Sequence, residues 1–482
     1  MKRNLIFMLA VFCPFMSIGQ EIIDLGSKRE IFVDDYIIGR LDGLSIQMHT
    51  PRDEGPVLFF DKPWEGLFSG YVTIIKDQDR YRAYYRGRAE LGKDGDEHEI
   101  TCYAQSEDGK HWEKPDLKIY PYKGLSDNNI VLANAAPVTH NFCPFLDANP
   151  AALSSQKYKA VGGTHENGLI AYVSPDGIHW QKLQDESVFK KGVFDSQNVV
   201  FWSESERCYV CYFRVWSEGG FSAYNGIRTV ARTTSADFVN WSEPERMTFG
   251  NTPLEELYTN QTSPYFRAPH IYVAIGGRFM PKRQVLTEAQ AKELNVNPNY
   301  FKDCSDVFFM TSRGGNRYDR TFMEAFIRPG IGMNNWVSRS NYPALNVVQT
   351  GADEMSVYVN QNYAQPTAHL RRYSLRLDGF TSISAPYAGG EVLTKPFTFT
   401  GKELEINYST SAAGEIRFEI QDEKGNTIPG FTLDDSDMIV GNEITRIVSW
   451  KGNRDLQKLA LKAIRLRIYM KDADLYSIRF TH

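Results

Sequence analysis

A seven-residue phrase recurs three times along this chain and constrains its fold more than any other feature. Ser106-Glu107-Asp108-Gly109-Lys110-His111-Trp112 returns as Ser174-Pro175-Asp176-Gly177-Ile178-His179-Trp180. A looser copy, Ser235-Ala236-Asp237-Phe238-Val239-Asn240-Trp241, follows at a similar interval. Self-similarity at a regular period is typical of a chain built from repeated supersecondary units.

Each copy of the phrase has the composition of a tight turn between two strands. Ser and Asp side chains bond to the backbone of such turns, Gly tolerates a positive φ, and Trp opens the next strand by burying a large apolar surface. A β-rich run precedes every copy, at residues 100–104, 169–173 and 227–231. Three copies in one register predict repeated hairpins rather than three unrelated turns.

Strand-like runs fill the chain from about residue 22 to residue 386 and group into five units, each with room for four antiparallel strands. Such a unit is one blade of a β-propeller. After Gly389-Gly390, apolar and polar residues alternate at 404–408, 416–420 and 464–468, as in strands with one solvated face. We therefore predict an all-β protein, with a five-bladed β-propeller at 20–390 followed by a small C-terminal β-sandwich at 391–482 that is structural rather than sugar-binding.

One short helix is expected at 287–294, in an insertion of the fourth unit that covers one face of the ring, with Thr287 as its N-cap. The N-terminus has the pattern of a signal peptide at residues 1–19, with Lys2 and Arg3 before an apolar run and Ser17-Ile18-Gly19 at the cleavage site. We expect an exported protein, periplasmic or extracellular, that starts at Gln20 and has no membrane span.

The composition limits the classes of partner that the protein is expected to bind. The net charge is −5 and no basic run occurs, so nucleic acid and anionic membranes are poor partners. Five cysteines follow the signal segment, and an odd number leaves at least one thiol free. Cys208 and Cys211 have the spacing of a redox or zinc pair, but they lie in a strand pattern without a second pair, which favours a packing role. Aromatic residues make up 13% of the chain and suit stacking on sugar rings.

The predicted catalytic groups are acids at the starts of inner strands, because these starts converge on the axis of a propeller. Glycoside hydrolysis needs two carboxyl groups, one as acid and one as nucleophile or base. Asp195 precedes the apolar run 199–201, Glu354 precedes a clear strand, and Glu65 lies between Trp64 and Gly66. These three are the predicted catalytic residues. The alternative for Asp195 is a strand-capping turn, and for Glu354 and Glu65 a solvated loop carboxylate.

The predicted substrate-binding residues share the same strand ends: His140, Asn141, Gln197, Asn198, Glu256, Tyr258, Asn260, Arg278 and Arg371. An inward-pointing arginine would hold a sugar carboxylate through paired hydrogen bonds, whereas an outward one would form a surface or inter-blade salt bridge. A histidine at a strand end can equally be satisfied by backbone. No metal-ligand cluster is visible in the sequence, so no cofactor is predicted, although an axial cation such as calcium stays open.

The three phrases that end in Trp112, Trp180 and Trp241 resemble the blade motifs of five-bladed propeller glycosidases, the superfamily that holds glycoside hydrolase families 43 and 32. The resemblance covers about residues 30–390. It implies a catalytic carboxylate pair in the axial funnel. The chain departs from these families at two places: Glu65 and Ser69 stand where an Asp is usual on the first inner strand, and the Asp195 segment stands where a Glu acid is expected in the third blade. The families' catalytic residues therefore cannot be transferred by motif.

The function predicted from the sequence is an exported glycoside hydrolase that degrades a poly- or oligosaccharide through paired carboxylates in the propeller funnel. Two alternatives stay open. One is a non-catalytic glycan-binding propeller, because the usual acid and base motifs are missing. The other is a phosphorylase or lyase on the same scaffold, with Tyr258 and His140 as its reactive groups.

Overall fold

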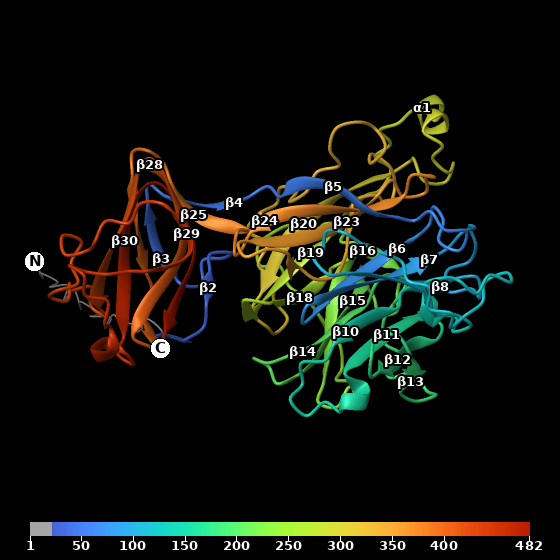
Figure 1. The fold of residues 1–482 in the computed structure, drawn as a ribbon, viewed down its shortest axis with the longest axis horizontal. Helices are drawn as coiled ribbons and strands as arrows, with labels where there is room; N and C mark the ends of the chain where they lie inside the picture. Colours follow the sequence, from blue (N-terminus) through green and yellow to red (C-terminus); the bar gives the residue numbers. More distant parts are fainter. Residues whose placement is uncertain (1–21) are drawn as a thin grey trace, which may run out of the picture.

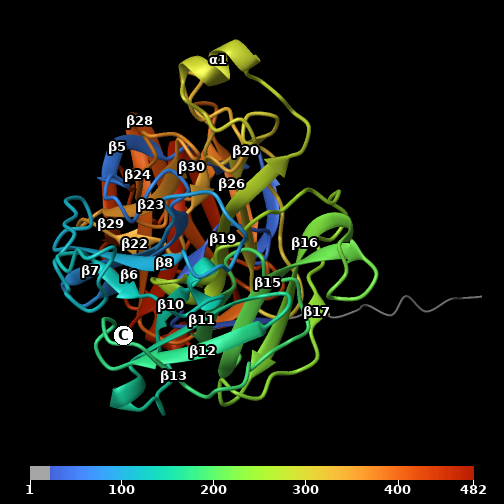
Figure 2. The ribbon, with the colours of Figure 1, turned by 90° about the vertical axis from the view of Figure 1, so that its right-hand side faces the viewer.

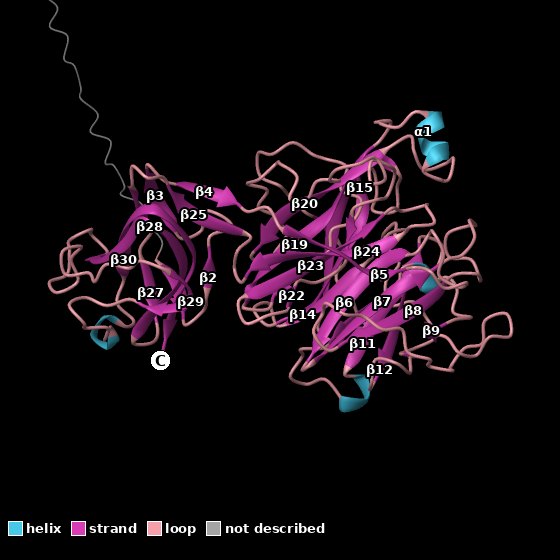
Figure 3. Ribbon diagram, turned by 45° about the horizontal axis from the view of Figure 1, so that its top comes forward, coloured by secondary structure: helices cyan, strands magenta, loops and turns pink. Residues whose placement is uncertain are grey.

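The protein consists of two β-structured bodies that lie side by side (Figure 1). A computed structural model describes residues 22–482, so the predicted signal peptide lies outside the described residues. The larger body is a ring of five sheets, and the smaller is built from one ten-stranded sheet. Strands dominate both bodies, and the few helices are short (Figure 3). The prediction of an all-β chain with a five-bladed propeller is confirmed.

Four blades follow one another along the chain. The first comprises β6 (Gly70–Asp77), β7 (Arg80–Gly87), β8 (Ile100–Ser106) and β9 (Ile130–Leu132). The second comprises β10 (Cys143–Leu146), β11 (Tyr158–Thr164), β12 (Gly168–Ser174) and β13 (Gln181–Lys182). The third comprises β14 (Val199–Ser203), β15 (Cys208–Glu218), β16 (Asn225–Ser235) and β17 (Glu245–Arg246). The fourth comprises β18 (Thr262–Tyr265), β19 (Ala268–Met280) and β20 (Cys304–Ser312).

The fifth blade closes the ring with a strand from the other end of the propeller chain. Its strands are β21 (Tyr342–Pro343), β22 (Val348–Gln349), β23 (Glu354–Gln361), β24 (His369–Arg376) and β5 (Arg52–Phe59). β5 pairs antiparallel with β24, with Leu58 opposite Leu370. Both leucines are buried in one core cluster, so the closing strand is held by packing as well as by hydrogen bonds.

The recurring phrase forms the turn that follows the third strand of the first three blades. In the second blade, the Ser174 hydroxyl oxygen accepts a hydrogen bond from Gly177 N at 2.9 Å. Asp176 accepts from the backbone N–H groups of Ile178 at 2.8 Å and His179 at 2.9 Å. The same bonds recur around Asp108, and Asp237 makes the equivalent bonds to Val239 and Asn240. The predicted repeat of one turn in one register is confirmed.

The turns also join neighbouring blades. The Tyr84 hydroxyl of the first blade donates to the Gly177 carbonyl of the second at 2.8 Å. The Tyr358 hydroxyl of the fifth blade donates in the same way to the Gly109 carbonyl of the first. Gly177 has φ +76°, and a Cβ there would lie 2.6 Å from the Tyr84 hydroxyl. Glycine is thus required both by the backbone conformation and by the approach of the tyrosine.

The smaller body includes strands from both ends of the described chain. From the C-terminal part come β25 (Thr381–Ala385), β26 (Gly390–Thr394), β27 (Phe397–Phe399), β28 (Glu403–Asp422), β29 (Asn442–Ile447) and β30 (Ile464–Thr481). From the N-terminal part come β1 (Ile23–Gly26), β2 (Glu30–Ile31), β3 (Ile38–Asp42) and β4 (Ser45–Met48). The strand pairing therefore differs from the predicted domain ranges 20–390 and 391–482. Alternating sequence marks a strand with one buried face but does not identify its partners.

The axis of the propeller is filled by amide side chains. Gln197 Nε2 donates to Thr73 Oγ1 at 2.7 Å, and Gln261 Nε2 donates to Gln197 Oε1 at 2.6 Å. Both glutamines are buried, and the Cys143 thiol packs against Gln197. Open space near the axis lies on both sides of this layer, in a small cavity at the strand starts and in a larger pocket of about 400 Å³ lined by later residues of the inner strands.

The insertion of the fourth blade contains the predicted helix, α1 (Glu288–Glu293). Thr287 caps it, with Gln290 N donating to Thr287 Oγ1 at 3.2 Å, so both the helix and its cap are confirmed. Figure 2, which views the propeller from its end remote from the smaller body, shows α1 standing clear of the blades. Tyr300 connects the insertion to the ring of blades, because the centre of its aromatic ring lies 5.6 Å from that of Phe68.

All five cysteines that the structure describes are free, which fits the odd count in the sequence. Over residues 22–482, the helices are too short or too polar to cross a membrane.

Candidate active site at the propeller axis

A narrow cavity opens where the inner strands of the first and fifth blades begin. Its walls are Gly70, Tyr71, Arg86, Arg339, Tyr342, Asn360 and Tyr363. Its innermost volume is about 20 Å³, which is room for one water-sized group. Side chains from the second, third and fourth blades adjoin these walls, so every blade contributes to the site. The cavity is lined by arginines and tyrosines rather than by acids.

Asp195 and Tyr258 are held together by one arginine. Arg214 lies on β15, is 3% exposed and forms an ion pair with Asp195. Its Nη1 donates to the Tyr258 carbonyl at 3.4 Å, and its guanidinium lies 4.4 Å from the centre of the Tyr258 ring. Tyr71 completes the connection to the cavity, because its hydroxyl donates to the Asp195 carbonyl at 3.3 Å.

Tyr258 lies among cations and other aromatic rings. Its ring centre is 4.9 Å from that of Tyr342, and the Arg339 guanidinium is 5.8 Å from it. Burial opposes ionisation of the phenol, but the charges of Arg339 and Arg214 outweigh burial and lower the pKa of Tyr258 below its usual value. Tyr71 and Tyr342, where burial dominates, have raised pKa values. Tyr258, which packs against the wall residue Tyr342, is thus the tyrosine best suited to act as an acid or base.

A second charged network supports Arg86. Arg86 Nη2 donates to the Tyr363 hydroxyl at 3.1 Å, and its Nη1 lies 3.7 Å from Glu99. His140 Nδ1 lies 2.9 Å from Glu99 Oε2, and Arg88 also pairs with Glu99. Burial would raise the pKa of Glu99, but His140, Arg86 and Arg88 lower it to about 2. Glu99 is therefore an anion that positions Arg86 and His140.

Within residues 22–482, Asp94, Glu99 and His140 are the one group of three side chains close enough together to hold a metal ion. Two guanidinium groups already contact Glu99, and both would repel a cation there. His140 Nδ1 is likewise directed at Glu99. The three residues fit an ion-pair network better than a metal centre.

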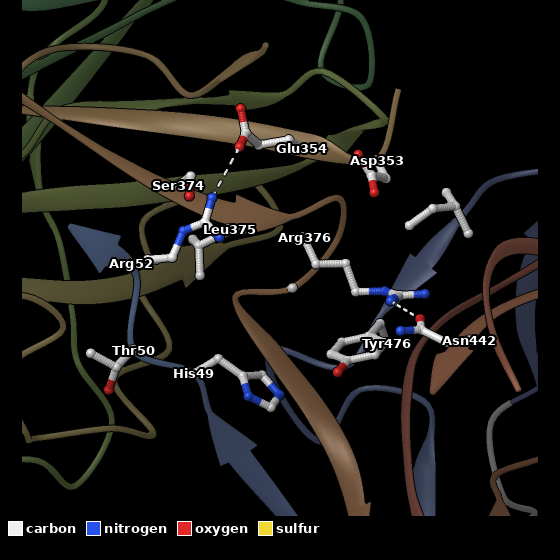
Figure 4. Close-up of a pocket in the computed structure, with 12 residues that line it drawn as sticks. His49, Thr50, Arg52, Asp353, Glu354, Ser374, Leu375, Arg376, Asn442 and Tyr476 are labelled. Carbon is white, nitrogen blue, oxygen red and sulfur yellow. Dashed lines mark hydrogen bonds and ion pairs between the residues drawn. The ribbon is translucent and has the colours of Figure 1, made fainter. Parts of the chain in front are cut away.

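Of the three predicted catalytic acids, only Asp195 lies at this site. Glu354 begins β23, whose far end carries Asn360 at the cavity, so strand geometry separates the two by about 20 Å. Glu354 instead lines a pocket between the two bodies, where it lies 3.7 Å from Arg52 (Figure 4). It also pairs with Lys110 at 2.9 Å and with Arg372 at 3.0 Å. Glu65 is fully buried and accepts from the Tyr85 hydroxyl and from Lys114, each at 2.6 Å. The predicted carboxylate pair is not brought together.

The predicted substrate-binding residues divide in the same way. Tyr258 is at the site, and His140 lies against its wall, 5.7 Å from the Tyr71 ring. Four predicted residues are buried and form hydrogen bonds to backbone or side-chain groups of the protein: Asn141, Gln197, Asn198 and Asn260. The remaining three predicted residues form salt bridges. Glu256 pairs with Arg228, Arg278 pairs with Glu255 and Asp306, and Arg371 pairs with Asp53.

The predicted residues did not include the arginines of this site. Arg86 ends the run Tyr84-Tyr85-Arg86 on β7, and Arg214 ends Tyr212-Phe213-Arg214 on β15. An arginine inside a strand's buried apolar run is a signal of inward charge, and its recurrence in two blades would have strengthened it. Arg339 gave no such signal, because it lies in an irregular segment.

Comparisons with known proteins extend to the fold only. No protein-family model matches the chain, and no curated protein matches its sequence. A solved structure described as a glycoside hydrolase has a TM-score of 0.44 at 11% identity, covering 68% of this chain and 92% of its own. A family 43 arabinoxylan arabinofuranohydrolase from Bacillus subtilis in complex with cellotetraose has a TM-score of 0.41 at 10% identity, covering 87% of this chain and 96% of its own. A family 130 glycoside hydrolase that targets β-1,2 mannosidic linkages in Candida mannan has a TM-score of 0.36 at 14% identity, covering 72% and 96%. Likenesses this distant leave the activity to be argued from the residues.

Proposed function

We propose that the protein is an enzyme that cleaves glycosidic bonds at the axial cavity, with Asp195 and Tyr258 as its reactive groups. The observation that carries this proposal is that Arg214 binds both residues beside the cavity. Asp195 is 29% exposed in its side chain, so its carboxylate is accessible from solvent. The arrangement replaces the carboxylate pair expected from the sequence with a carboxylate and a phenol.

The two groups have complementary chemistry for hydrolysis. An ion-paired carboxylate such as Asp195 can activate a water molecule or stabilise the positive charge that develops on the sugar. A phenol whose pKa is lowered by neighbouring arginines can transfer a proton to or from an oxygen. Sialidases also depart from the carboxylate pair, with a tyrosine as the nucleophile.

Of the alternative reactions, elimination by a lyase is the one that a specific observation favours. A lyase needs a base to remove a proton from the sugar, and the lowered pKa of Tyr258 suits that role. The two reactions differ in their products, because elimination leaves an unsaturated sugar that absorbs ultraviolet light. Hydrolysis leaves only a new reducing end.

The test measures product release from a panel of plant and algal polysaccharides and their oligosaccharides. Ultraviolet absorbance detects elimination, and an assay for new reducing ends detects hydrolysis. Asp195→Asn and Tyr258→Phe are expected to lower kcat by about a hundredfold or more. Glu354→Gln is the matched control, because Glu354 is an ion-paired acid remote from the cavity, and it is expected to retain activity. Full activity in both site variants, or loss of activity in Glu354→Gln alone, would reject the site.

We also propose export, on the strength of the signal-like pattern of residues 1–19. Mass spectrometry of the protein secreted by an expressing cell is expected to give a mature N-terminus at Gln20. A mature protein that retains Met1 and stays in the cytoplasm would contradict it.

A further inference from the structure

The charges around the cavity do not balance. Arg86 has Glu99 at 3.7 Å, and Arg214 has Asp195 as its ion-pair partner. Arg339 makes no ion pair within residues 22–482. Its guanidinium contacts aromatic rings instead. Its guanidinium lies 5.8 Å from the Tyr258 ring centre and 5.2 Å from that of Tyr300. One positive charge at the cavity is therefore left without an anion.

This charge is kept in place at an energetic cost. Arg339 is only partly exposed, and desolvating a cation without a counter-ion is unfavourable. Its backbone also has φ +60°, a conformation that side chains other than glycine rarely adopt. Aromatic faces offset part of the cost, because they attract a guanidinium. An anion bound in the cavity would supply what is missing.

Unpaired polar atoms in the cavity wall point to the same conclusion. Asn360 is 2% exposed, and neither atom of its side-chain amide has a hydrogen-bond partner in the described structure. Arg86 Nε is also buried without a partner. Buried polar groups are nearly always paired, so unpaired ones that face a cavity indicate a ligand that pairs with them. The innermost space of about 20 Å³ admits a small substituent and excludes a whole sugar ring.

An exposed aromatic side chain of the third blade can hold the rest of such a sugar. Tyr224 is 53% exposed and stands 5.7 Å from the His165 ring and 6.1 Å from the Trp216 ring. Tyr224 lies in the connection between β15 and β16, and β15 is the strand that carries Arg214. An exposed ring in this position can stack on the apolar face of a sugar.

We propose that the cavity recognises the negatively charged substituent of an acidic sugar, with Arg339 as its principal counter-ion and Arg86 and Asn360 as hydrogen-bond donors. The inference rests on the proposed function for the presence of a sugar, but its recognition step is separate from cleavage. A carboxylate, as in a uronic acid, matches the fork of a guanidinium. The acidic sugar is thus bound by residues other than the arginines that the sequence pattern suggested, Arg278 and Arg371.

The test measures binding to the full mature chain by isothermal titration calorimetry. The probes are oligosaccharides of galacturonate and of glucuronate, a sulfated galactan oligosaccharide, neutral oligosaccharides of galactose and of glucose, and inorganic phosphate. A uronate oligosaccharide is expected to bind at least about tenfold more tightly than its neutral counterpart, which is the range for charge-assisted hydrogen bonds. Arg339→Gln is expected to abolish this preference, and Arg339→Lys to retain part of it.

Arg328→Gln is the matched control, because Arg328 is an exposed arginine of the same connecting segment and lies outside the cavity wall. It is expected to leave the preference unchanged. Equal or undetectable binding of acidic and neutral sugars by the wild-type protein would overturn the inference without any variant. Phosphate binding that depends on Arg339, with no uronate preference, would also overturn it and assign the cavity to free phosphate. Selectivity for the sulfated oligosaccharide alone would support the charge and reject the carboxylate.

The outcomes for binding and cleavage are distinguishable. Selective binding of uronates without product release would reject the proposed enzyme and leave the recognition site standing. Release of products from neutral glycans, without any preference for acidic ones, would support the proposed enzyme and reject the recognition site.

Discussion

At the scale of single residues, the buried carboxylate of Glu99 has the largest energetic consequence near the site. It is fully buried and pairs with His140, Arg86 and Arg88. Because its pKa falls to about 2 from an ordinary value of 4.5, the stability that it contributes is present above pH 4.5 and is lost as the pH falls toward 2. The shift corresponds to about 3 kcal/mol at neutral pH.

Glu99→Gln is therefore expected to lower the free energy of unfolding by about 3 kcal/mol at neutral pH, with a difference from wild type that shrinks below pH 4.5. Chemical denaturation at a series of pH values measures this. Glu107→Gln is the control, because Glu107 is an exposed acid of a turn, and it should change stability little at any pH. A Glu99→Gln deficit that stays constant into acid would contradict the ionic role of Glu99.

Residue-level prediction from the sequence succeeded where the chemistry is local. Asp108, Asp176 and Asp237 bond to backbone N–H groups two and three residues ahead, so the turn is specified within one short phrase. The same backbone bonds lower the pKa of each of these carboxyl groups. The roles of Glu354 and Glu65 could not be found this way. Their partners Arg372, Lys110, Tyr85 and Lys114 come from other strands or turns, and only the fold brings them close.

At the scale of elements, the strand that closes the ring is the feature the sequence concealed. β5 contains Gly55 and Pro56, which weaken a strand pattern, and it lies more than three hundred residues from β24 in the chain. Two register shifts in the pairing accommodate these residues. What holds β5 is the burial of Leu58, which is 4% exposed, against Leu370.

Leu58→Ala should therefore destabilise the propeller by about 2–5 kcal/mol, the range for a leucine deleted from a packed core. Leu153→Ala is the matched control, since Leu153 is 62% exposed and its truncation should cost well under about 1 kcal/mol. Thermal and chemical unfolding of the two variants checks the difference. Equal stability of both would mean that β5 does not close the ring in solution.

At the scale of the whole molecule, Asp378 joins the two bodies. It is fully buried in the turn between β24 and β25. From the propeller, the Tyr265 hydroxyl donates to it at 2.8 Å and Arg267 lies 3.2 Å away. From the smaller body, Ser477 Oγ donates at 2.7 Å, Asn407 Nδ2 donates at 3.1 Å and Arg29 lies 3.6 Å away.

Because the N-terminal strands belong to the smaller body, the chain crosses between the two bodies twice. The chain enters the smaller body first, crosses into the propeller at β5, completes the ring and returns through the Asp378 turn. Because β4 pairs with β25, the outgoing and returning segments are bonded to each other at the crossing. The sequence predicted the existence of both bodies. It could not predict that the N-terminal strands belong to the smaller one, because the partners of β30 include β2 near the N-terminus as well as β25, β26 and β28 near the C-terminus.

Removing the Asp378 carboxylate should separate the unfolding of the two bodies. Asp378→Ala leaves Arg29 and Arg267 without their shared anion, and removing one partner of a buried ionic group costs about 3–5 kcal/mol. In differential scanning calorimetry we expect the wild type to unfold in one transition and Asp378→Ala to show two, with the earlier one lowered. Asp53→Ala is the control, because Asp53 pairs with Arg371 at the surface with 53% of its side chain exposed, where an ion pair contributes under about 1 kcal/mol. If Asp378→Ala unfolds in one transition at the wild-type temperature, the charged junction does not couple the bodies, and their association must depend on the paired strands β4 and β25.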